Sequence, residues 1–269
     1  MIRNVLSIAG SDPSGGAGIQ ADLKTFAARG VYGMAVLTAL TAQNTRGVWG
    51  IHAVPAAFVA DQISAVLADI RVDAVKIGMI ANAEIAEAVA DALAGHERVP
   101  VVLDPVMAAK GGASLLKRDA VEVVVERLLP LARLLTPNLP EAALLLGMPE
   151  ASDHDAMADQ ARRLLALGST AVLVKGGHLA GGYSPDVLVS SGQEIWFEGK
   201  RTATPNTHGT GCTLSSAIAT ELAKGAQLVE AVAIAKDYLA GAIAASDALS
   251  VGSGHGPVHH FHRLWGTER

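Results

Sequence analysis

Near its start the chain has a short apolar run, Val5-Leu6-Ser7-Ile8-Ala9, which leads into Gly10-Ser11-Asp12-Pro13-Ser14-Gly15-Gly16-Ala17-Gly18. An apolar run of this length, bounded by turn residues and lacking period-two alternation, is typical of a strand that is buried on both faces. Ile19, Leu23 and Phe26 then recur at helical spacing. A strand, a glycine-rich turn and a helix in this order predict the opening unit of a parallel α/β sheet.

The same alternation continues along the chain. Five further apolar runs are predicted to be strands: Met34–Ala39, Ala74–Ile77, Val99–Leu103, Leu134–Thr136 and Ala171–Val174. Amphipathic segments separate them, so we expect right-handed crossovers and helices on both faces of a mainly parallel sheet.

One segment departs from this pattern and predicts an antiparallel edge of the sheet. Asp186–Val189 and Glu194–Phe197 flank Ser190-Ser191-Gly192, a pattern typical of a β-hairpin with a short turn. No internal repeat, linker or shift in composition divides the chain, so we expect a single domain over residues 1–269.

Two helix boundaries are also predicted. Ser152 and Asp155 have the spacing of a capping box before Leu164. Pro140 suits the first turn of a short helix that stops at Gly147.

The composition excludes several classes of protein. Half of the residues are apolar, 17% are charged and the mean hydropathy is +0.34, which is incompatible with disorder. Cys212 is the only cysteine, so an internal disulfide is impossible. Charged residues such as Arg46 and Lys236 interrupt the apolar stretches too early for a membrane-spanning helix, and no signal segment is recognised. We therefore expect a cytoplasmic protein without a membrane partner.

The charge balance argues against nucleic acid as a partner. The net charge is −5, and the sequence contains neither a basic run nor an excess of aromatic residues. Nucleic-acid binding proteins usually display a basic patch that neutralises phosphates. A small-molecule substrate is the more consistent expectation.

Polar residues follow the predicted strands, where ligands of open α/β sheets bind. The segments concerned are Gly10–Gly18, Thr41–Thr45, Gly78-Met79, Asp104–Val106, Thr136–Glu141 and Lys175–His178. Ordinary turn chemistry explains their glycines and prolines, but it explains the acidic, amide and lysine side chains less well. Thr41–Thr45 is expected to be a loop after the second strand.

The segment Asn206–Thr213 precedes an apolar helical stretch. A glycine-rich loop that opens a helix presents free N–H groups and a positive dipole end, which suits a phosphate. A tight turn into a packed helix is an equally weighted alternative. Cys212 lies where this helix begins, and a helix dipole can lower the pKa of a thiol at such a position. Three roles compete for Cys212: a base or positioning group, a nucleophile with His208, or a small buried residue, and the residues alone favour the last.

Three further polar sites have alternatives. Lys175 either neutralises phosphate charge or is an ordinary surface lysine. Asn138 and Glu141 would suit Mg²⁺ with Asp104 nearby, although Asn138 is equally well placed as a helix cap and Asp104 as a turn former. The histidines at the C-terminal end are expected to serve packing and hydrogen bonding rather than zinc binding. They are His255, His259, His260 and His262.

Taken together, these segments resemble the hydroxymethylpyrimidine/phosphomethylpyrimidine kinases of thiamine biosynthesis, from the first strand to the C-terminal end and in the same order. The segments that carry the resemblance are Ala9–Thr25, Thr38–Thr45, Lys76–Met79, Thr136–Ala142, Lys175–His178, Asn206–Thr213 and Gly256–His262. The resemblance implies a ribokinase-like, three-layer α/β fold and usually a homodimer. It also implies ATP- and Mg²⁺-dependent phosphorylation of 4-amino-5-hydroxymethyl-2-methylpyrimidine and then of its monophosphate.

The resemblance also assigns roles to individual residues. Gln43 would hydrogen-bond the aminopyrimidine, with Asp22, Met79 and Val106 lining the same pocket. Gly209, Thr210, Gly211 and Cys212 would form the anion hole for the transferred phosphoryl group. Lys175 would offset phosphate charge, while Asn138 and Glu141, with Asp104 nearby, would organise Mg²⁺. Loops near Gly15-Gly16 and Lys110-Gly111-Gly112 are expected to move over the substrate.

Many relatives in the ribokinase-like superfamily carry Asp where this sequence has Cys212, so the resemblance leaves its role as a base open. Three other functions compete. Pyridoxal or pyridoxine kinase activity would use the same scaffold, a Cys212/His208 hydrolase would need no ATP, and a binding module would keep the pocket without catalysis. The full set of Lys175, Asn138, Glu141 and the glycine-rich loop favours an enzyme over a binding module.

Overall fold

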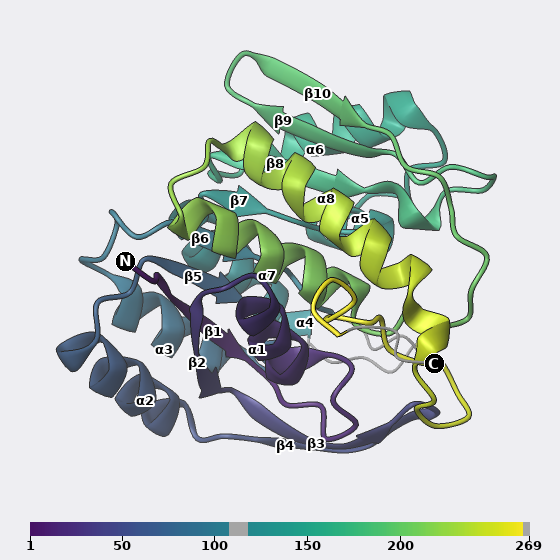
Figure 1. Ribbon diagram of the computed structural model, residues 1–269. Coiled ribbons are helices and arrows are strands. Elements are labelled where there is room, and N and C mark those ends of the chain that lie inside the picture. The colour runs from purple at the N-terminus through teal and green to yellow at the C-terminus, as the bar shows by residue number, and fades with distance from the viewer. Residues whose placement is uncertain (108–117, 266–269) are drawn as a thin grey trace.

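The computed structural model describes residues 1–107 and 118–265 (Figure 1). Its centre is an eight-stranded sheet with the strand order β10-β9-β8-β7-β6-β5-β1-β2. These strands are β1 (Asn4–Ala9), β2 (Tyr32–Leu37), β5 (Ala74–Ile77), β6 (Val101–Leu103), β7 (Leu134–Leu135), β8 (Ala171–Lys175), β9 (Asp186–Ser190) and β10 (Gln193–Phe197).

In the order of the sheet, the neighbouring strands of the series β8-β7-β6-β5-β1-β2 pair in parallel. Strand β9 pairs antiparallel with both β8 and β10. The predicted mainly parallel sheet with an antiparallel edge is therefore confirmed. Ser191 and Gly192 form the turn between β9 and β10, as the sequence predicted.

Helices cover both faces of this sheet, which gives three layers (Figure 1). On one face lie α1 (Gly18–Ala28), α7 (Thr210–Ala223) and α8 (Leu228–Ala244). On the other lie α2 (Ala56–Asp69), α3 (Ala83–Leu93), α4 (Arg118–Val123), α5 (Leu139–Leu146) and α6 (His154–Leu165). Short helical turns complete the elements: η1 (Val124–Leu128), η2 (Leu129–Leu131), η3 (Gly176–His178) and η4 (Ser246–Ala248).

Successive side chains of the strands enter two different cores. In β8, Ala171 and Leu173 pack with α7 and α8, while Val172 and Val174 pack with the helices of the opposite face. Alternate residues of a strand point to opposite faces, so a strand between two helical layers is apolar throughout. The apolar strands between the two helical layers account for the positive mean hydropathy. Among the residues that the structure describes, no helix is both long and apolar enough to cross a membrane.

The second predicted strand and the loop after it are placed differently. The expected strand Met34–Ala39 is divided, because β2 ends at Leu37 and the Thr38 hydroxyl donates to the carbonyl of Met79 at 2.6 Å. Thr41–Thr45, expected as a loop, lies largely in β3 (Ala39–Asn44), which forms a separate antiparallel hairpin with β4 (Gly47–Ala53). The prediction of a loop was therefore wrong, since the polar sequence of β3 concealed a strand.

The helix boundaries confirm one prediction and correct the other. Pro140 lies in the first turn of α5, which ends at Gly147 in the left-handed conformation. The cap of α6, however, is Asp153, whose side chain accepts from the N–H of Ala156 at 2.9 Å. The capping box predicted at Ser152 and Asp155 is therefore wrong, because the helix begins one residue later than the pattern suggested.

Candidate active site

Two glycine-rich loops meet at the carboxyl end of β1. One is the segment of residues 10–17 between β1 and α1, and the other is the segment of residues 206–209 before α7. A Cβ on Gly209 would collide with the carbonyl oxygen of Gly16, and a Cβ on Gly16 would collide with the ring of His208. Gly209 also has a φ of 78°, which favours glycine. Only glycine at both positions therefore lets the two loops touch.

Asp12 organises this contact. Its carboxylate accepts hydrogen bonds from the N–H groups of Ser14, Gly16 and Ala17 and is 2.8 Å from Nε2 of His208. Burial would raise the pKa of Asp12, but hydrogen bonds from His208 and Ser14 outweigh it and lower the pKa to about 2. His208 thus ties one loop to the other. Asp12 was not among the predicted site residues, although its place before Pro13 in a glycine-rich loop was a signal.

The first turn of α7 presents its backbone N–H groups at this edge of the sheet. Gly209 is the N-cap, and no side chain among the described residues caps the helix. Thr210, Gly211 and Cys212 form the first turn, where N–H groups have no partner within the helix. An uncapped N-terminus of a fourteen-residue helix is suited to an anion, as the sequence predicted.

Lys175 and Asp104 lie directly beside this turn. Nζ of Lys175 is 2.8 Å from Oδ1 of Asp104 and 4.0 Å from Oε2 of Glu141. A Cβ on Gly211 would lie 3.3 Å from Nζ of Lys175 and 3.5 Å from Oδ2 of Asp104. The helix can approach the pair this closely because residue 211 has no side chain.

Both members of the pair are charged at neutral pH. Burial would lower the pKa of Lys175, but the negative charges of Asp104 and Glu141 outweigh it and raise the pKa. Burial would raise the pKa of Asp104, but Lys175 and Lys76 lower it. Thr136 and Ser215 also donate to Asp104, each at 3.3 Å. The alternative of Lys175 as an ordinary surface lysine is excluded, because only 13% of its side chain is exposed.

Asn138 and Glu141 form a capping box at the start of α5. The N–H of Glu141 donates to Oδ1 of Asn138, and the N–H of Asn138 donates to Oε2 of Glu141, both at 2.8 Å. Burial raises the pKa of Glu141 to about 7; the charge of Lys175 opposes this shift and that of Asp104 adds to it. Of the alternatives left open for Asn138, the helix cap is confirmed.

These contacts limit how a magnesium ion would be held. The side-chain oxygen of Asn138 and one oxygen of Glu141 serve the cap, while Asp104 faces Lys175. In the part of the chain that the structure describes, no group of three His, Cys, Asp or Glu side chains is arranged for a metal. Mg²⁺ commonly keeps water ligands and binds through one carboxylate together with substrate phosphates. The residues present fit that mode, with Glu141 as the carboxylate.

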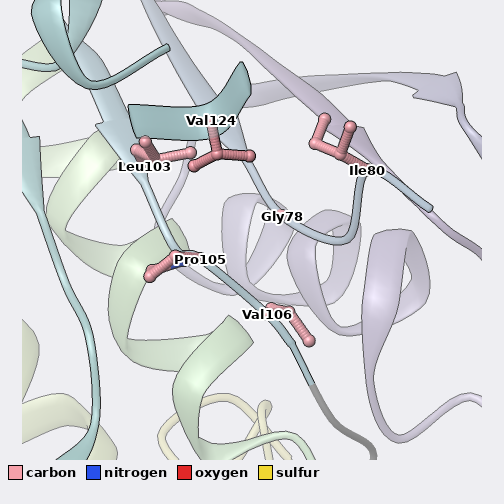
Figure 2. A pocket seen from close by; sticks show the side chains of 6 residues that line it. All are labelled: Gly78, Ile80, Leu103, Pro105, Val106 and Val124. Carbon is pink, nitrogen blue, oxygen red and sulfur yellow. The ribbon is translucent and has the colours of Figure 1, made fainter. Parts of the chain in front are cut away.

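Three of the four residues predicted to line a substrate pocket lie near this edge. Met79 follows β5 and contacts Gly10, whose added Cβ would be 2.9 Å from the Met79 sulfur. Gln43 accepts from the hydroxyl of Thr41, which also donates to the carbonyl of Ser11. Val106 lies beside Gly78 at the ends of β6 and β5, where it lines a small cavity with Ile80 (Figure 2). Lys110–Gly112, predicted as a moving loop, lies outside the described residues.

The fourth residue, Asp22, is placed differently. It is fully buried, and its carboxylate accepts from the Ser7 hydroxyl at 2.6 Å, from Nζ of Lys76 at 2.9 Å and from the Ser216 hydroxyl at 2.7 Å. These donors come from β1, β5 and α7, so Asp22 joins the sheet to α7. Lys76 was not predicted as a partner of Asp22, although a lysine inside an apolar strand was a signal.

Cys212 is half-buried, and its environment differs from the expectation. Burial raises the pKa of the Cys212 thiol to about 11; Lys76 lowers it, while Asp22 and Asp104 raise it further. The thiol pKa is therefore raised rather than lowered, because burial and two carboxylates outweigh the groups that favour the thiolate. Among the described residues, the hydrogen bond of the His208 ring joins it to Asp12 and not to Cys212.

The histidine-rich tail packs against α7 and α8. Nε2 of His260 is 3.1 Å from the Thr213 hydroxyl, and the Tyr238 hydroxyl donates to the carbonyl of His260 at 2.6 Å. Burial lowers the pKa of His260 to about 3. The predicted role of these histidines in packing and hydrogen bonding is confirmed for His260, which ties the tail to the helix carrying Cys212.

Comparison with known proteins shows that the chain is similar to named kinases over almost its whole length. The hydroxymethylpyrimidine/phosphomethylpyrimidine kinase of Rhizobium meliloti (strain 1021) is 55% identical over 265 residues, covering 98% of this chain and 99% of that protein. The protein of the same name from Escherichia coli (strain K12) is 53% identical, covering 97% of this chain and 98% of that protein.

Solved structures share the fold. Bacillus subtilis pyridoxal kinase, in an ADP complex, aligns with a TM-score of 0.89 at 37% identity, covering 98% of this chain and 100% of that one. Clostridium difficile phosphomethylpyrimidine kinase aligns with a TM-score of 0.79 at 44% identity, covering 90% and 99%. The predicted ribokinase-like fold is confirmed by these likenesses. The family model for phosphomethylpyrimidine kinase matches residues 12–259. With nine-tenths of its length inside that model and half of its residues shared with such enzymes, the chain belongs to the phosphomethylpyrimidine kinase family.

Proposed function

We propose that this protein is an ATP-dependent kinase of thiamine biosynthesis. It phosphorylates 4-amino-5-hydroxymethyl-2-methylpyrimidine on its hydroxymethyl group and then phosphorylates the monophosphate to the diphosphate. The observation that carries this proposal is the approach of Lys175 to the first turn of α7, where a Cβ on Gly211 would be 3.3 Å from Nζ. A buried ammonium beside uncapped N–H groups is the arrangement that a phosphoryl group in transfer requires.

The roles of the individual residues follow from this geometry. The N–H groups of Thr210, Gly211 and Cys212 hold the transferred phosphoryl group, and Lys175 offsets its charge. Lys175 then exchanges part of its contact with Asp104 for a phosphate oxygen. When bound, Mg²⁺ neutralises the charge of the ATP phosphates, with Glu141 as the protein carboxylate next to it.

Cys212 acts by position in this proposal. Its thiol pKa of about 11 keeps it protonated at neutral pH, so it is a poor general base. In a loose phosphoryl-transfer transition state, the orientation of the attacking hydroxyl matters more than its early deprotonation. We therefore place the hydroxymethyl group of the substrate beside Cys212, with the ring toward Gln43, Met79 and Val106.

Pyridoxal kinase activity is the competing function. The pyridoxal kinases of Bacillus subtilis and Staphylococcus aureus share the fold with TM-scores of 0.89, the latter at 32% identity and with AMP-PCP and pyridoxal bound. The relatives at 53% to 55% identity carry the pyrimidine kinase name, and this higher similarity favours the pyrimidine substrate.

Release of ADP from ATP and Mg²⁺ tests the proposal, with the pyrimidine, its monophosphate and pyridoxal as separate substrates. We expect turnover with both pyrimidines and a higher kcat/KM for the pyrimidine than for pyridoxal. Turnover with pyridoxal alone would replace the proposal by the competing function. Absence of ADP with all three substrates would refute a kinase of either kind.

We also propose that residues 1–269 form one domain and that two copies form a dimer. The eight-stranded sheet uses strands from residues 4 to 197, and the later helices pack back on it. Leu40, Trp49 and Ile51 of the β3–β4 hairpin are exposed, which suits a subunit contact. Light scattering should give the mass of a dimer, and Trp49→Asp should shift it toward the monomer; an unchanged dimer would place the contact elsewhere. The cytoplasmic location stays a prediction.

A further inference from the structure

A second lysine–aspartate pair lies beneath the proposed site. Lys76 of β5 and Asp22 of α1 are 2.9 Å apart, and neither side chain has any exposed area. The resemblance of the sequence to known kinases gave Lys76 no role. A fully buried ion pair costs much of its attraction in desolvation, so its presence is weak evidence for stability alone.

The pair is connected to the face of α7 that carries Cys212. Ser216 donates to Oδ1 of Asp22 at 2.7 Å. Ser216 follows Cys212 by four residues in the same helix, and side chains at that spacing lie on one face. The half-buried thiol is therefore directed toward the level of the sheet at which Asp22 and Lys76 lie.

The ammonium of Lys76 also reaches the carboxyl end of the sheet. A Cβ on Gly78 would lie 2.6 Å from Nζ of Lys76, so the glycine leaves the space that the ammonium occupies. An ammonium has three hydrogen-bond donors, and Asp22 accepts from one of them at 2.9 Å. The positive charge is thus held close to the ends of β5 and β1, below the two glycine-rich loops.

The charged groups around Cys212 come from four elements. Lys76 of β5 favours the thiolate, and Asp22 of α1 and Asp104 after β6 oppose it. Lys175 at the end of β8 also interacts with the thiol. The backbone N–H of Gly18 also favours the thiolate. Lys76 is the cation with the largest influence on the thiol, and the charges of Asp22 and Asp104 together hold the pKa of Lys76 above its ordinary value.

We propose that Lys76, fixed by Asp22, is a positioning residue that acts through Cys212: its buried charge sets the reactivity of the thiol and the placement of the first turn of α7. The effect on phosphoryl transfer rests on the proposed function, whereas the effect on the thiol does not. A purely structural pair would support the sheet equally well but would leave the chemistry of Cys212 unchanged.

Alkylation of the thiol tests this without substrate or ATP. Cys212 is the only cysteine, so the rate of reaction with iodoacetamide reports this residue alone. At a fixed pH below the thiol pKa, the rate follows the thiolate fraction. We expect Lys76→Met to slow alkylation and Asp22→Asn to accelerate it, each by roughly three- to tenfold, the size of a one-unit change in pKa after correction for nucleophilicity.

The matched control is Ser7→Ala. It removes another hydrogen bond to the Asp22 carboxylate, donated at 2.6 Å, without changing any charge, and we expect little change in the alkylation rate. Circular dichroism verifies that each variant is folded. If Lys76→Met does not fold, Asp22→Asn alone decides: an unchanged or slower rate in that folded variant overturns the proposal. Equal changes in all three variants would also overturn it, because they would indicate loosening rather than charge.

A kinetic measurement addresses the catalytic part. In Lys76→Met we expect kcat for the pyrimidine to fall while KM for ATP stays within about twofold, and Lys76→Arg to restore part of kcat because it keeps the charge. A change confined to KM, or no recovery with arginine, would contradict the positioning role. If the alkylation rates shift but no kinase activity is found in the unaltered protein, the proposed function fails while the inference about the thiol stands.

Discussion

Two lysine–aspartate pairs support the start of α7, one closed and one open. In the closed pair Lys76 and Asp22 have no exposed side-chain area, whereas in the open pair 13% of Lys175 and 2% of Asp104 are exposed. The distances are nearly equal, 2.9 and 2.8 Å. Adjacent serines of α7 serve them, with Ser216 donating to Asp22 and Ser215 to Asp104.

The two pairs contain the same residue types but differ in whether a ligand can reach them. The closed pair has no access to a ligand, so its charges form a fixed background for the helix and for Cys212. The open pair faces Gly211 and Glu141 at the edge of the sheet, where an incoming phosphate can compete with Asp104 for Lys175. The same two residue types thus support structure in one place and, as we propose, chemistry in the other.

The largest effect on stability is expected from breaking the closed pair. Lys76→Met leaves Asp22 charged and buried without its cation, and such removals typically cost about 3–5 kcal/mol. Urea unfolding followed by circular dichroism measures this cost. Lys200→Met, at an exposed lysine, is the control. A loss below about 1 kcal/mol would show that the closed pair is not the stronger support.

The largest effect on activity is expected from breaking the open pair. Lys175→Met removes the cation beside Gly211, and losing one such stabilising group typically lowers kcat by about 10²- to 10³-fold. Steady-state ADP release measures kcat, and urea unfolding of the same variant should show a smaller loss of stability than for Lys76→Met. If kcat is retained, the assignment of Lys175 to the phosphoryl group is wrong.

Cys212 lies between the two pairs, and its removal tests position against base catalysis. Cys212→Ala should lower kcat by about ten- to a hundredfold, less than the loss of a general base would cause, while ATP affinity stays nearly unchanged. The thiol pKa of about 11 implies that the pH profile of kcat between pH 6 and 9 keeps its shape in this variant. Turnover that equals that of the unaltered protein with both pyrimidines would remove Cys212 from the site.

The sequence predicted the parallel sheet that carries the two lysine–aspartate pairs, but it did not predict the pairs themselves. Apolar runs located the parallel strands, because strands covered on both faces are apolar throughout. The β3–β4 hairpin was not predicted because its strands are largely exposed and lie outside the main sheet, so no buried apolar run marks them. The partner of a buried lysine is set by tertiary contact: Lys76 and Asp22 are 54 residues apart, and His208 and Asp12 are 196 apart. No local sequence pattern indicates a contact between residues that are so far apart along the chain.

For the site, the sequence predicted where the residues gather more reliably than what each one does. Lys175, Gly211 and Asp104 meet as expected at the carboxyl edge of the sheet. Asn138 proved to be a helix cap, a role that its spacing to Glu141 allowed from the outset. Asp22 was assigned to the substrate pocket through resemblance, and the structure shows it fully buried in an ion pair with Lys76, which no local pattern indicated.

The open pair has a second carboxylate beside it, Glu141, and this gives it a pH dependence. The folded protein raises the pKa of Glu141 from an ordinary value of 4.5 to about 7, so it binds a proton that the unfolded chain has released. Stability from this group is therefore present below about pH 4.5 and lost as the pH rises toward 7. Glu141→Gln, which stays neutral and can still accept from Asn138, should remove this loss. The melting temperatures of the two proteins between pH 4.5 and 7.5 measure it, and parallel curves would contradict it.

The smallest and most closely matched effects come from the adjacent serines. Ser216→Ala removes a 2.7 Å hydrogen bond to the buried charge of Asp22, which should cost about 1.5–3 kcal/mol. Ser215→Ala removes a longer bond of 3.3 Å to Asp104, which keeps Lys175 and Thr136 as donors, so its cost should be about 0.5–1 kcal/mol. Urea unfolding of both variants gives the difference directly. Because the two changes are identical in chemistry and adjacent in one helix, equal costs would mean that burial does not separate the two pairs, and the distinction between a closed and an open pair would have to be abandoned.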